Sequence, residues 1–284
     1  MSIPTTLPQA AVTDAPTATP RLPGVWQNGW QRTRYELRVF FREMDQVIFS
    51  FGYPVIMLAI FASVFAGEVA PGVDFAQYFL PGMAATGIML SSFQTVAITI
   101  AMDRDDNTLK RLHGTPMPLT SYFLGKVGQV LVASVAQMVL LLAVARFVFD
   151  VPMPEAGRWL TFGWIFLLGN ATGTVLGVAF SSLPRSGKSA SAVVIPIVLV
   201  LQFTSGVFFP FESLPSWMQD ASAVFPLKWL AQGMRAVFLP DSFVTAEVTG
   251  EWELGLVALI LVVWLVVGLV AGIRSFRWTR RDDG

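Results

Sequence analysis

The chain has 284 residues, of which 54% are hydrophobic and only 13% are charged. Soluble domains carry about 25% charged residues, so this composition argues against a soluble domain and favours one membrane domain. The 19 Lys and Arg residues balance the 19 Asp and Glu residues, which gives no support to a nucleic-acid partner. The absence of Cys and the single His argue against disulfides, metal sites and Ser-His catalysis.

The first segments predict a tail followed by an interfacial helix. Residues 1–24 hold several prolines among Thr and Ala, and we expect a disordered cytoplasmic tail there. Over 25–46, apolar residues recur at helical spacing among arginines, which predicts an amphipathic helix lying on membrane lipids. A surface helix of a soluble domain would show the same period, but an apolar run follows at once. The residues expected to contact the lipid interface are Trp26, Trp30, Arg34, Arg38 and Arg42.

Six later stretches contain no charged residue, and each is long enough to cross about 30 Å of hydrocarbon as a helix. They cover residues 46–67, 75–102, 127–145, 159–184, 189–211 and 254–273. Helices are expected because open sheet edges are not tolerated in lipid. The sequence therefore predicts an all-α polytopic membrane protein, with a six-span domain over 47–278 and a short cytoplasmic tail over 279–284.

The Lys and Arg residues predict the orientation of the spans. With a cytoplasmic N-terminus, 15 of the 19 Lys and Arg residues lie on the inner side. The positive-inside rule then places both termini in the cytoplasm, in a multi-pass protein of the inner or plasma membrane. With the acids included, the inner segments sum to +6 and the outer loops to −6.

The polar residues inside the six stretches are amides and hydroxyls. Proton-coupled carriers and voltage sensors usually need ionisable groups in the membrane, so these classes lose support. Sodium coupling through backbone carbonyls needs no carboxylate and stays open. In the fourth stretch, Gly169, Gly173 and Gly177 allow another helix to approach closely, which we interpret as packing inside one subunit, with a dimer contact as the alternative.

The cytoplasmic loop over 102–126 predicts a short helix, with acidic and amide residues at its start and Gly and Pro at its end. Leu109 and Leu112, three residues apart, form an apolar ridge between charged neighbours. Such a ridge can dock into a groove of a partner, or it can hold a turn against the membrane.

The external segment over 205–239 is too apolar for a solvated loop. Its prolines open two short helices, which we expect to re-enter the outer leaflet while packed on protein or lining a wet cavity. This re-entrant motif consists of Gly206, Pro210, Leu214, Pro215, Trp217, Pro226 and Arg235.

From about residue 26 to 278, the chain resembles the permease subunits of type 2 ABC transporters, particularly the daunorubicin-exporter-like branch. The resemblance rests on the interfacial helix, the six spans, TLKRLHGTP over 108–116, and SGVFFPFESLPSWM and FPLKWLAQGMR within 205–235. Asn107 departs from the family pattern, which usually has Gly there, although Asn tolerates similar backbone angles.

The resemblance implies that two permeases, the same chain or a paralogue, pair around a central path on two ATP-binding-cassette ATPase subunits. ATP and Mg would bind to those ATPase subunits, and this chain would hold no cofactor or metal. The family's coupling helix and the interfacial helix would both meet the ATPase. The coupling-helix residues carried over are Asp106, Asn107, Thr108, Leu109, Lys110, Arg111, Leu112 and Thr115.

The resemblance also implies that spans one, two and five line the translocation path. The wall candidates are Phe49, Tyr53, Met57, Phe61, Gln94, Gln202 and Phe203. Aromatic residues at helical spacing usually belong to a core or to a lipid-facing surface, which is the alternative. Aromatic, uncharged walls would suit an amphipathic drug-like or lipid-like substrate.

The leading interpretation is the permease subunit of an ATP-driven exporter, which is not itself an enzyme because a partner hydrolyses the ATP. An ion-coupled secondary carrier is the alternative, and it would transport substrate without an ATPase. A membrane enzyme has little support, because His113 lies in a loop and the spans hold no pair of acids.

Overall fold

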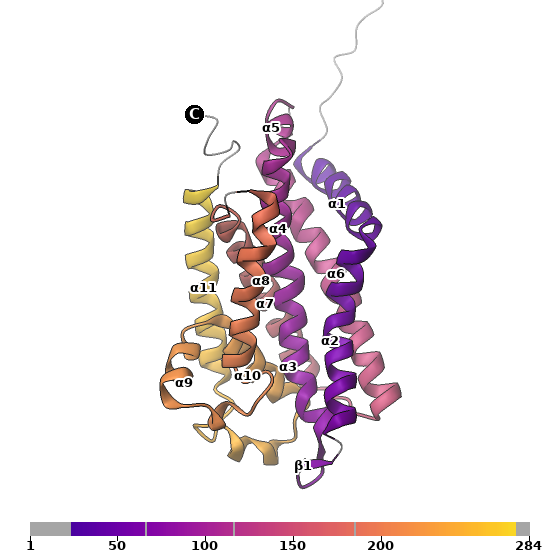
Figure 1. The fold of residues 1–284 in the computed structure, drawn as a ribbon, viewed down its shortest axis with the longest axis vertical. Helices are drawn as coiled ribbons and strands as arrows, with labels where there is room; N and C mark the ends of the chain where they lie inside the picture. Colours follow the sequence, from indigo (N-terminus) through magenta and orange to yellow (C-terminus); the bar gives the residue numbers. More distant parts are fainter. Residues whose placement is uncertain (1–23, 66, 116, 185, 277–284) are drawn as a thin grey trace, which may run out of the picture.

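The computed structural model describes residues 24–276 except 66, 116 and 185. Apart from Gly24, the tails predicted for 1–24 and 279–284 lie outside the described residues. The helices form one elongated bundle (Figure 1). Helices α1 (Val25–Arg42) and α5 (Thr108–His113) lie at one end, here called the α5 end. Helices α9 (Ser216–Ala223) and α10 (Pro226–Phe238) lie toward the other, here called the α10 end.

Six helices are long and apolar enough to cross a membrane, which confirms the prediction of an all-α protein with six spans. They are α2 (Met44–Val64), the continuous helix Phe75–Asp105, α6 (Leu119–Phe149), α7 (Arg158–Phe180), α8 (Gly187–Thr204) and α11 (Leu254–Ser275). The second of these is built from α3 (Phe75–Met89), a π-helical segment η1 (Leu90–Gln94) and α4 (Thr95–Asp105). Two 3₁₀ turns, η2 (Phe211–Ser213) and η3 (Asp241–Ala246), and a hairpin of β1 (Glu68–Ala70) and β2 (Val73–Asp74) lie in the connections.

The helix ends differ from the predicted limits. The interfacial helix ends at Arg42 instead of residue 46, because Glu43 leaves the helical backbone with φ −84° and ψ 77° and α2 starts at Met44. Asp45 then lies in the first turn of α2, where a negative charge suits the helix dipole. The third span begins at Leu119 instead of residue 127, so Lys126 lies inside this long helix.

The continuous helix Phe75–Asp105 is the centre of the bundle. Every residue of α3 from Ala76 to Met89 is buried. Helices α2, α6, α7 and α10 all pack against α3, and α8 packs against α4. The main apolar core joins residues of α2, α3, α6, α7, α8, α10 and α11, and two smaller apolar clusters lie apart from it.

The glycine stripe of α7 packs within the chain, as the first interpretation expects. A Cβ atom on Gly177 would lie 2.8 Å from the carbonyl oxygen of Phe93 and 2.9 Å from Cβ of Val96. Gly173 faces Ser92 in η1, and Gly169 faces Leu230 in α10. The missing side chains therefore let α7 approach the central helix closely.

We predict that Gly177→Ala lowers the stability of the bundle, because the new methyl group meets backbone that cannot turn aside. Overpacking of this kind costs about 1–3 kcal/mol. Gly163→Ala on the same helix is the matched control, since nothing lies within 4 Å of a Cβ there. The midpoint of thermal unfolding in detergent is measured for both variants. Equal midpoints for the two would contradict the close α7 contact.

Candidate functional site

Helix α5 is anchored by the leucines that the sequence offered as a docking ridge. Leu109 is fully buried among Val96, Ile100 and Tyr122, and Leu112 is partly buried against the same cluster. The prediction that this ridge faces a partner is therefore wrong for Leu109. Apolar side chains gain more by covering the ends of α4 and α6 than by facing water.

The exposed surface of α5 and its flanks is polar instead. It consists of Asp106, Asn107, Lys110, Arg111 and Thr115, while Thr108 is partly buried and accepts a hydrogen bond from Arg111 at 3.3 Å. Asn107 precedes the helix with φ 57°, a left-handed conformation that Asn tolerates better than most residues. Its side chain makes no capping bond, so the backbone turn, and not a cap, sets the direction of α5.

Helix α1 packs along the first turns of α6 through small residues. Gly125 faces Arg32 and Gly128 faces Thr33 so closely that neither position has room for a Cβ atom. The hydroxyl of Ser121 donates to the carbonyl oxygen of Val25 at 3.0 Å. All five residues proposed for the lipid interface, Trp26, Trp30, Arg34, Arg38 and Arg42, lie exposed on α1.

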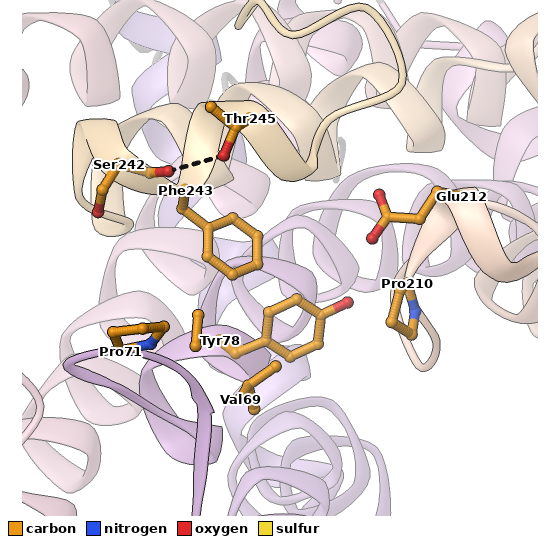
Figure 2. Close-up of a pocket in the computed structure, with 9 residues that line it drawn as sticks. Val69, Pro71, Tyr78, Pro210, Glu212, Ser242, Phe243 and Thr245 are labelled. Atoms are coloured by element: carbon orange, nitrogen blue, oxygen red, sulfur yellow. Dashed lines mark hydrogen bonds between the residues drawn. The ribbon is translucent and has the colours of Figure 1, made fainter.

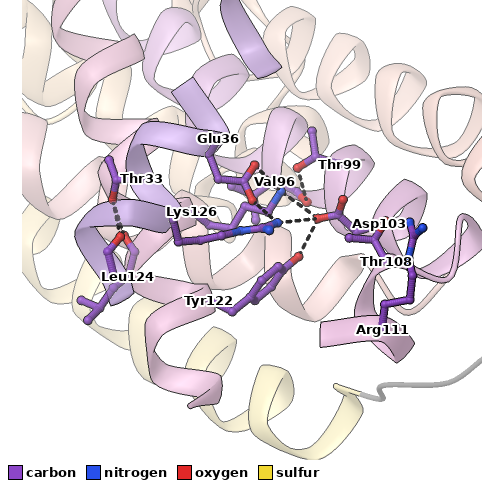
Figure 3. Close-up of polar contacts among 12 residues, drawn as sticks. Thr33, Glu36, Val96, Thr99, Asp103, Thr108, Arg111, Tyr122, Leu124 and Lys126 are labelled. Atoms are coloured by element: carbon purple, nitrogen blue, oxygen red, sulfur yellow. Dashed lines mark hydrogen bonds and ion pairs between the residues drawn. The ribbon is translucent and has the colours of Figure 1, made fainter. Parts of the chain in front are cut away.

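A buried group of charges joins α1, α4 and α6, and we call it the ionic cluster: Arg32, Glu36, Asp103 and Lys126, with the hydroxyl of Tyr122. The ammonium of Lys126 lies 3.0 Å from Glu36 Oε2 and 2.9 Å from Asp103 Oδ2 (Figure 3). Arg32 contacts Glu36 Oε1 at 2.5 Å, and Tyr122 donates to Asp103 at 2.8 Å. The side chain of Lys126 is only 2% exposed. The two cations and two carboxylates balance, which is what allows their burial.

The sequence pattern does not reveal this cluster, because it places Asp103 and Lys126 in the predicted cytoplasmic loop over 102–126. One signal was present in α1. Glu36 shares a helical face with Gly29, Thr33 and Phe40, and that face is the buried one. An acid on the small, packed face of an amphipathic helix indicates a buried cation opposite, but its identity depends on a helix 90 residues away.

Three candidate path residues meet where α2 and α8 touch. The hydroxyl of Tyr53 donates to Gln202 Oε1 at 2.7 Å, and the ring of Phe49 stacks on Tyr53 with a centroid distance of 6.0 Å. Gln202 is buried, whereas Phe49 is 56% exposed. This contact lies beside an exposed apolar surface of both helices.

The remaining path candidates are more scattered. Phe61 and Phe203 both pack against Phe208, with ring centroids 5.8 and 4.8 Å away. Met57 is partly buried against the main core, and Gln94 is partly buried at the end of η1. The structure therefore joins the α2 and α8 candidates through shared contacts and places Gln94 on the central helix.

Arg235 of the predicted re-entrant motif forms a second buried ion pair at the α10 end. Arg235 binds both oxygens of Glu247, with Nε to Oε1 at 2.5 Å and Nη2 to Oε2 at 3.0 Å. Its third contact is the carbonyl oxygen of Gly206 at 3.4 Å. Gly206 has φ +72°, and a Cβ atom there would lie 2.9 Å from Cβ of Phe211, so this turn requires glycine.

The helices of this motif differ in burial. Every residue of α10 is buried, and the helix packs against α3, α7 and α11 with Pro226 in its first turn. On α9, Trp217 is 67% exposed. Pro210 precedes η2, and Leu214 and Pro215 connect η2 to α9. The re-entrant position of α9 and α10 in a membrane stays a prediction.

The chain is similar in sequence to proteins described as transport permeases and as an ABC transporter. The chain is 21% identical over 184 residues to "Probable multidrug ABC transporter permease YbhR" of Escherichia coli, covering 65% of this chain and 50% of that protein. It is 21% identical over 229 residues to "Inner membrane transport permease YadH" of the same organism, covering 78% of this chain and 88% of that protein. It is also 25% identical over 173 residues to "ABC transporter G family member 20" of Dictyostelium discoideum, covering 60% of this chain and 23% of that protein.

The chain thus spans about half the length of the first of these relatives. The family model described as "ABC-2 type transporter" matches residues 29–239, which run from the buried face of α1 to the end of α10. The matched region includes the ionic cluster, α5, the α2–α8 contact and Arg235. The chain belongs to the ABC-2 type transporter family.

Proposed function

We propose that this chain is the membrane permease subunit of an ATP-binding-cassette exporter. The observation that carries the proposal is the ionic cluster, which fastens α1 and the α4–α5 corner to α6 at one end of six apolar helices. In this proposal, the α5 end faces the cytoplasm, both termini lie there, and the protein resides in the inner or plasma membrane. YadH is described as an inner membrane protein, which supports that location.

The exposed polar residues of α5 form the proposed docking surface for an ATPase. A push on this short helix passes directly into α4, because only Asp106 and Asn107 separate the two helices. The ionic cluster then carries the displacement to α1 and α6, since a buried, balanced set of charges resists separation. The burial of Leu109 makes α5 part of this rigid corner.

The complete transporter, in this proposal, holds two copies of the ATPase subunit, which bind the ATP and Mg. It also holds a second permease, the same chain or a paralogue. The exposed apolar residues of α2 and α8, such as Phe49 and Phe203, are available to the second permease or to lipid. A path beside the Tyr53–Gln202 contact would accept an amphipathic drug-like or lipid-like substrate. The name of YbhR as a multidrug permease supports this class.

The proposed function predicts transport that depends on an ATPase partner. The purified chain in vesicles, with and without an ATP-binding-cassette ATPase that co-purifies with it, should move a fluorescent amphipathic drug only when the partner and ATP are both present. An ATPase variant that binds but does not hydrolyse ATP is the control. Substrate movement by the chain alone, driven by a sodium gradient, would contradict the proposal and favour a secondary carrier.

Lys126→Met should loosen the corner, because Glu36 and Asp103 would then share one buried cation. Removing one partner from a buried ion pair costs about 3–5 kcal/mol. We expect a lower unfolding midpoint and fewer substrate molecules moved per ATP hydrolysed. Adding Glu36→Gln restores the balance of charge and should recover part of the midpoint.

Lys188→Met is the matched control for this test, because Lys188 is an exposed lysine near the start of α8. It should leave both measurements unchanged. A wild-type midpoint and coupling ratio in Lys126→Met would show that the ionic cluster does not link α1, α4 and α6.

Charge reversal on α5 tests the docking surface. Arg111→Glu should weaken recovery of the ATPase with the tagged permease by about tenfold, since close charge pairs at interfaces are worth more than one kcal/mol. Arg146→Glu is the control, because Arg146 is half exposed at the far end of α6. Equal recovery of the ATPase with both variants would show that the ATPase docks elsewhere than on α5.

A further inference from the structure

The α10 end contains a cavity of about 360 Å³ that the proposed function does not use. It lies between the β1–β2 hairpin, the start of α3, the turn before α9 and the 3₁₀ turn η3 (Figure 2). Its volume falls within the range of about 300–1,000 Å³ that is typical of small-molecule sites. The lining residues come from three stretches that are far apart in the sequence, 69–78, 210–212 and 242–245.

The walls of the cavity are mostly apolar, with two aromatic rings. The rings of Tyr78 and Phe243 lie 5.7 Å apart at an angle of 44°, and Val69 and Pro71 of the hairpin lie opposite Pro210 (Figure 2). Such a surface favours a flat or lipophilic body, and aromatic faces also attract cations.

The charges at the edge of the cavity are unequal. Arg235 is occupied by both carboxylate oxygens of Glu247, so this pair is neutral and offers little to an anion. Glu212 adds a second carboxylate, and Figure 2 shows it pointing toward Phe243 and the hydroxyl of Tyr78. Within the described part of the chain, no cationic side chain forms an ion pair with Glu212. The site therefore lacks one positive charge.

The surroundings of Glu212 disfavour an isolated negative charge there. Desolvation and the neighbouring carboxylate of Glu247 raise the pKa of the Glu212 carboxyl, against the opposite effect of Arg235. A cation that entered the cavity would offset the repulsion between Glu212 and Glu247. It would also give the Glu212 carboxylate an ion-pair partner.

We propose that this cavity binds a protonated amine attached to an aromatic or lipophilic body, with the ammonium against Glu212 and the body between Tyr78 and Phe243. The same chemistry occurs in soluble amphipathic amines and in the headgroups of aminolipids. The position of the cavity on the exit side rests on the proposed function, whereas the binding itself does not.

Binding of dansylcadaverine, a fluorescent aromatic amine, to the purified full chain in detergent tests the proposal. Its N-acetylated form is the neutral probe of nearly the same shape. Glu212→Gln removes the charge and keeps the size, and Glu251→Gln is the matched control because Glu251 is an exposed acid outside the cavity. Unfolding midpoints verify that each variant is folded.

We expect saturable binding of the amine that Glu212→Gln weakens about tenfold and Glu251→Gln leaves unchanged, as for loss of a charge-assisted hydrogen bond. The neutral probe should bind wild type about as weakly as the amine binds Glu212→Gln. Phe243→Ala should weaken both probes alike. Equal affinity of the amine for wild type and Glu212→Gln, or of both probes for wild type, would overturn the proposal.

A competition arm separates the two sources of the ammonium group. Displacement of the probe by short-chain phosphatidylethanolamine supports an aminolipid at this site, and persistence of the probe supports a soluble amine. These measurements use no ATPase and no ATP. A failure of ATP-driven transport would therefore leave the binding result standing, and a failure of binding would leave the transport result standing.

Discussion

The α5 end of this bundle depends on one requirement, that the ammonium of Lys126 be neutralised where it is nearly sealed from water. Glu36 on α1 and Asp103 on α4 meet that requirement, and each must reach the same point on α6. The glycines at 125 and 128 let α1 come close enough to do so. The place of α1 against the bundle, and the direction in which α4 leads into α5, both follow from this meeting of charges.

The α10 end also holds a buried cation that a carboxylate neutralises, but the charges around it do not balance. Arg235, wholly enclosed with the rest of α10, is satisfied by Glu247 from a later turn and by the carbonyl oxygen of Gly206. Here, however, Glu212 leaves the charges unbalanced beside an apolar cavity. A balanced cluster is suited to transmit force, because any separation exposes a bare charge. An unbalanced one is suited to receive a ligand.

Much of the fold could be predicted from local patterns, because six long apolar stretches leave few alternatives to six helices. The sites could not be predicted to the same degree, because their partners are distant in sequence. Leu109 looks like an exposed ridge until Val96 and Tyr122 cover it. Lys126 looks like the end of a loop until Glu36, 90 residues earlier, makes its place in a helix tolerable. Arg235 was singled out by its motif, whereas its partner Glu247 lies outside that motif.

Between the two charged ends of the bundle, the described contacts between α2 and α8 involve no charged side chains. Helices α2 and α8 meet through the neutral bond from Tyr53 to Gln202 and through aromatic rings around Phe208. A neutral hydrogen bond contributes only about 0.5–1.5 kcal/mol, and an aromatic pair adds about 0.5–1.5 kcal/mol beyond its buried area, less than a broken buried ion pair costs. The π-helical segment η1 interrupts the central helix at the level of the glycine stripe of α7. If force enters through the rigid corner at α5, the middle of the bundle can rearrange at lower cost than either end, and that is the part which a substrate would have to pass.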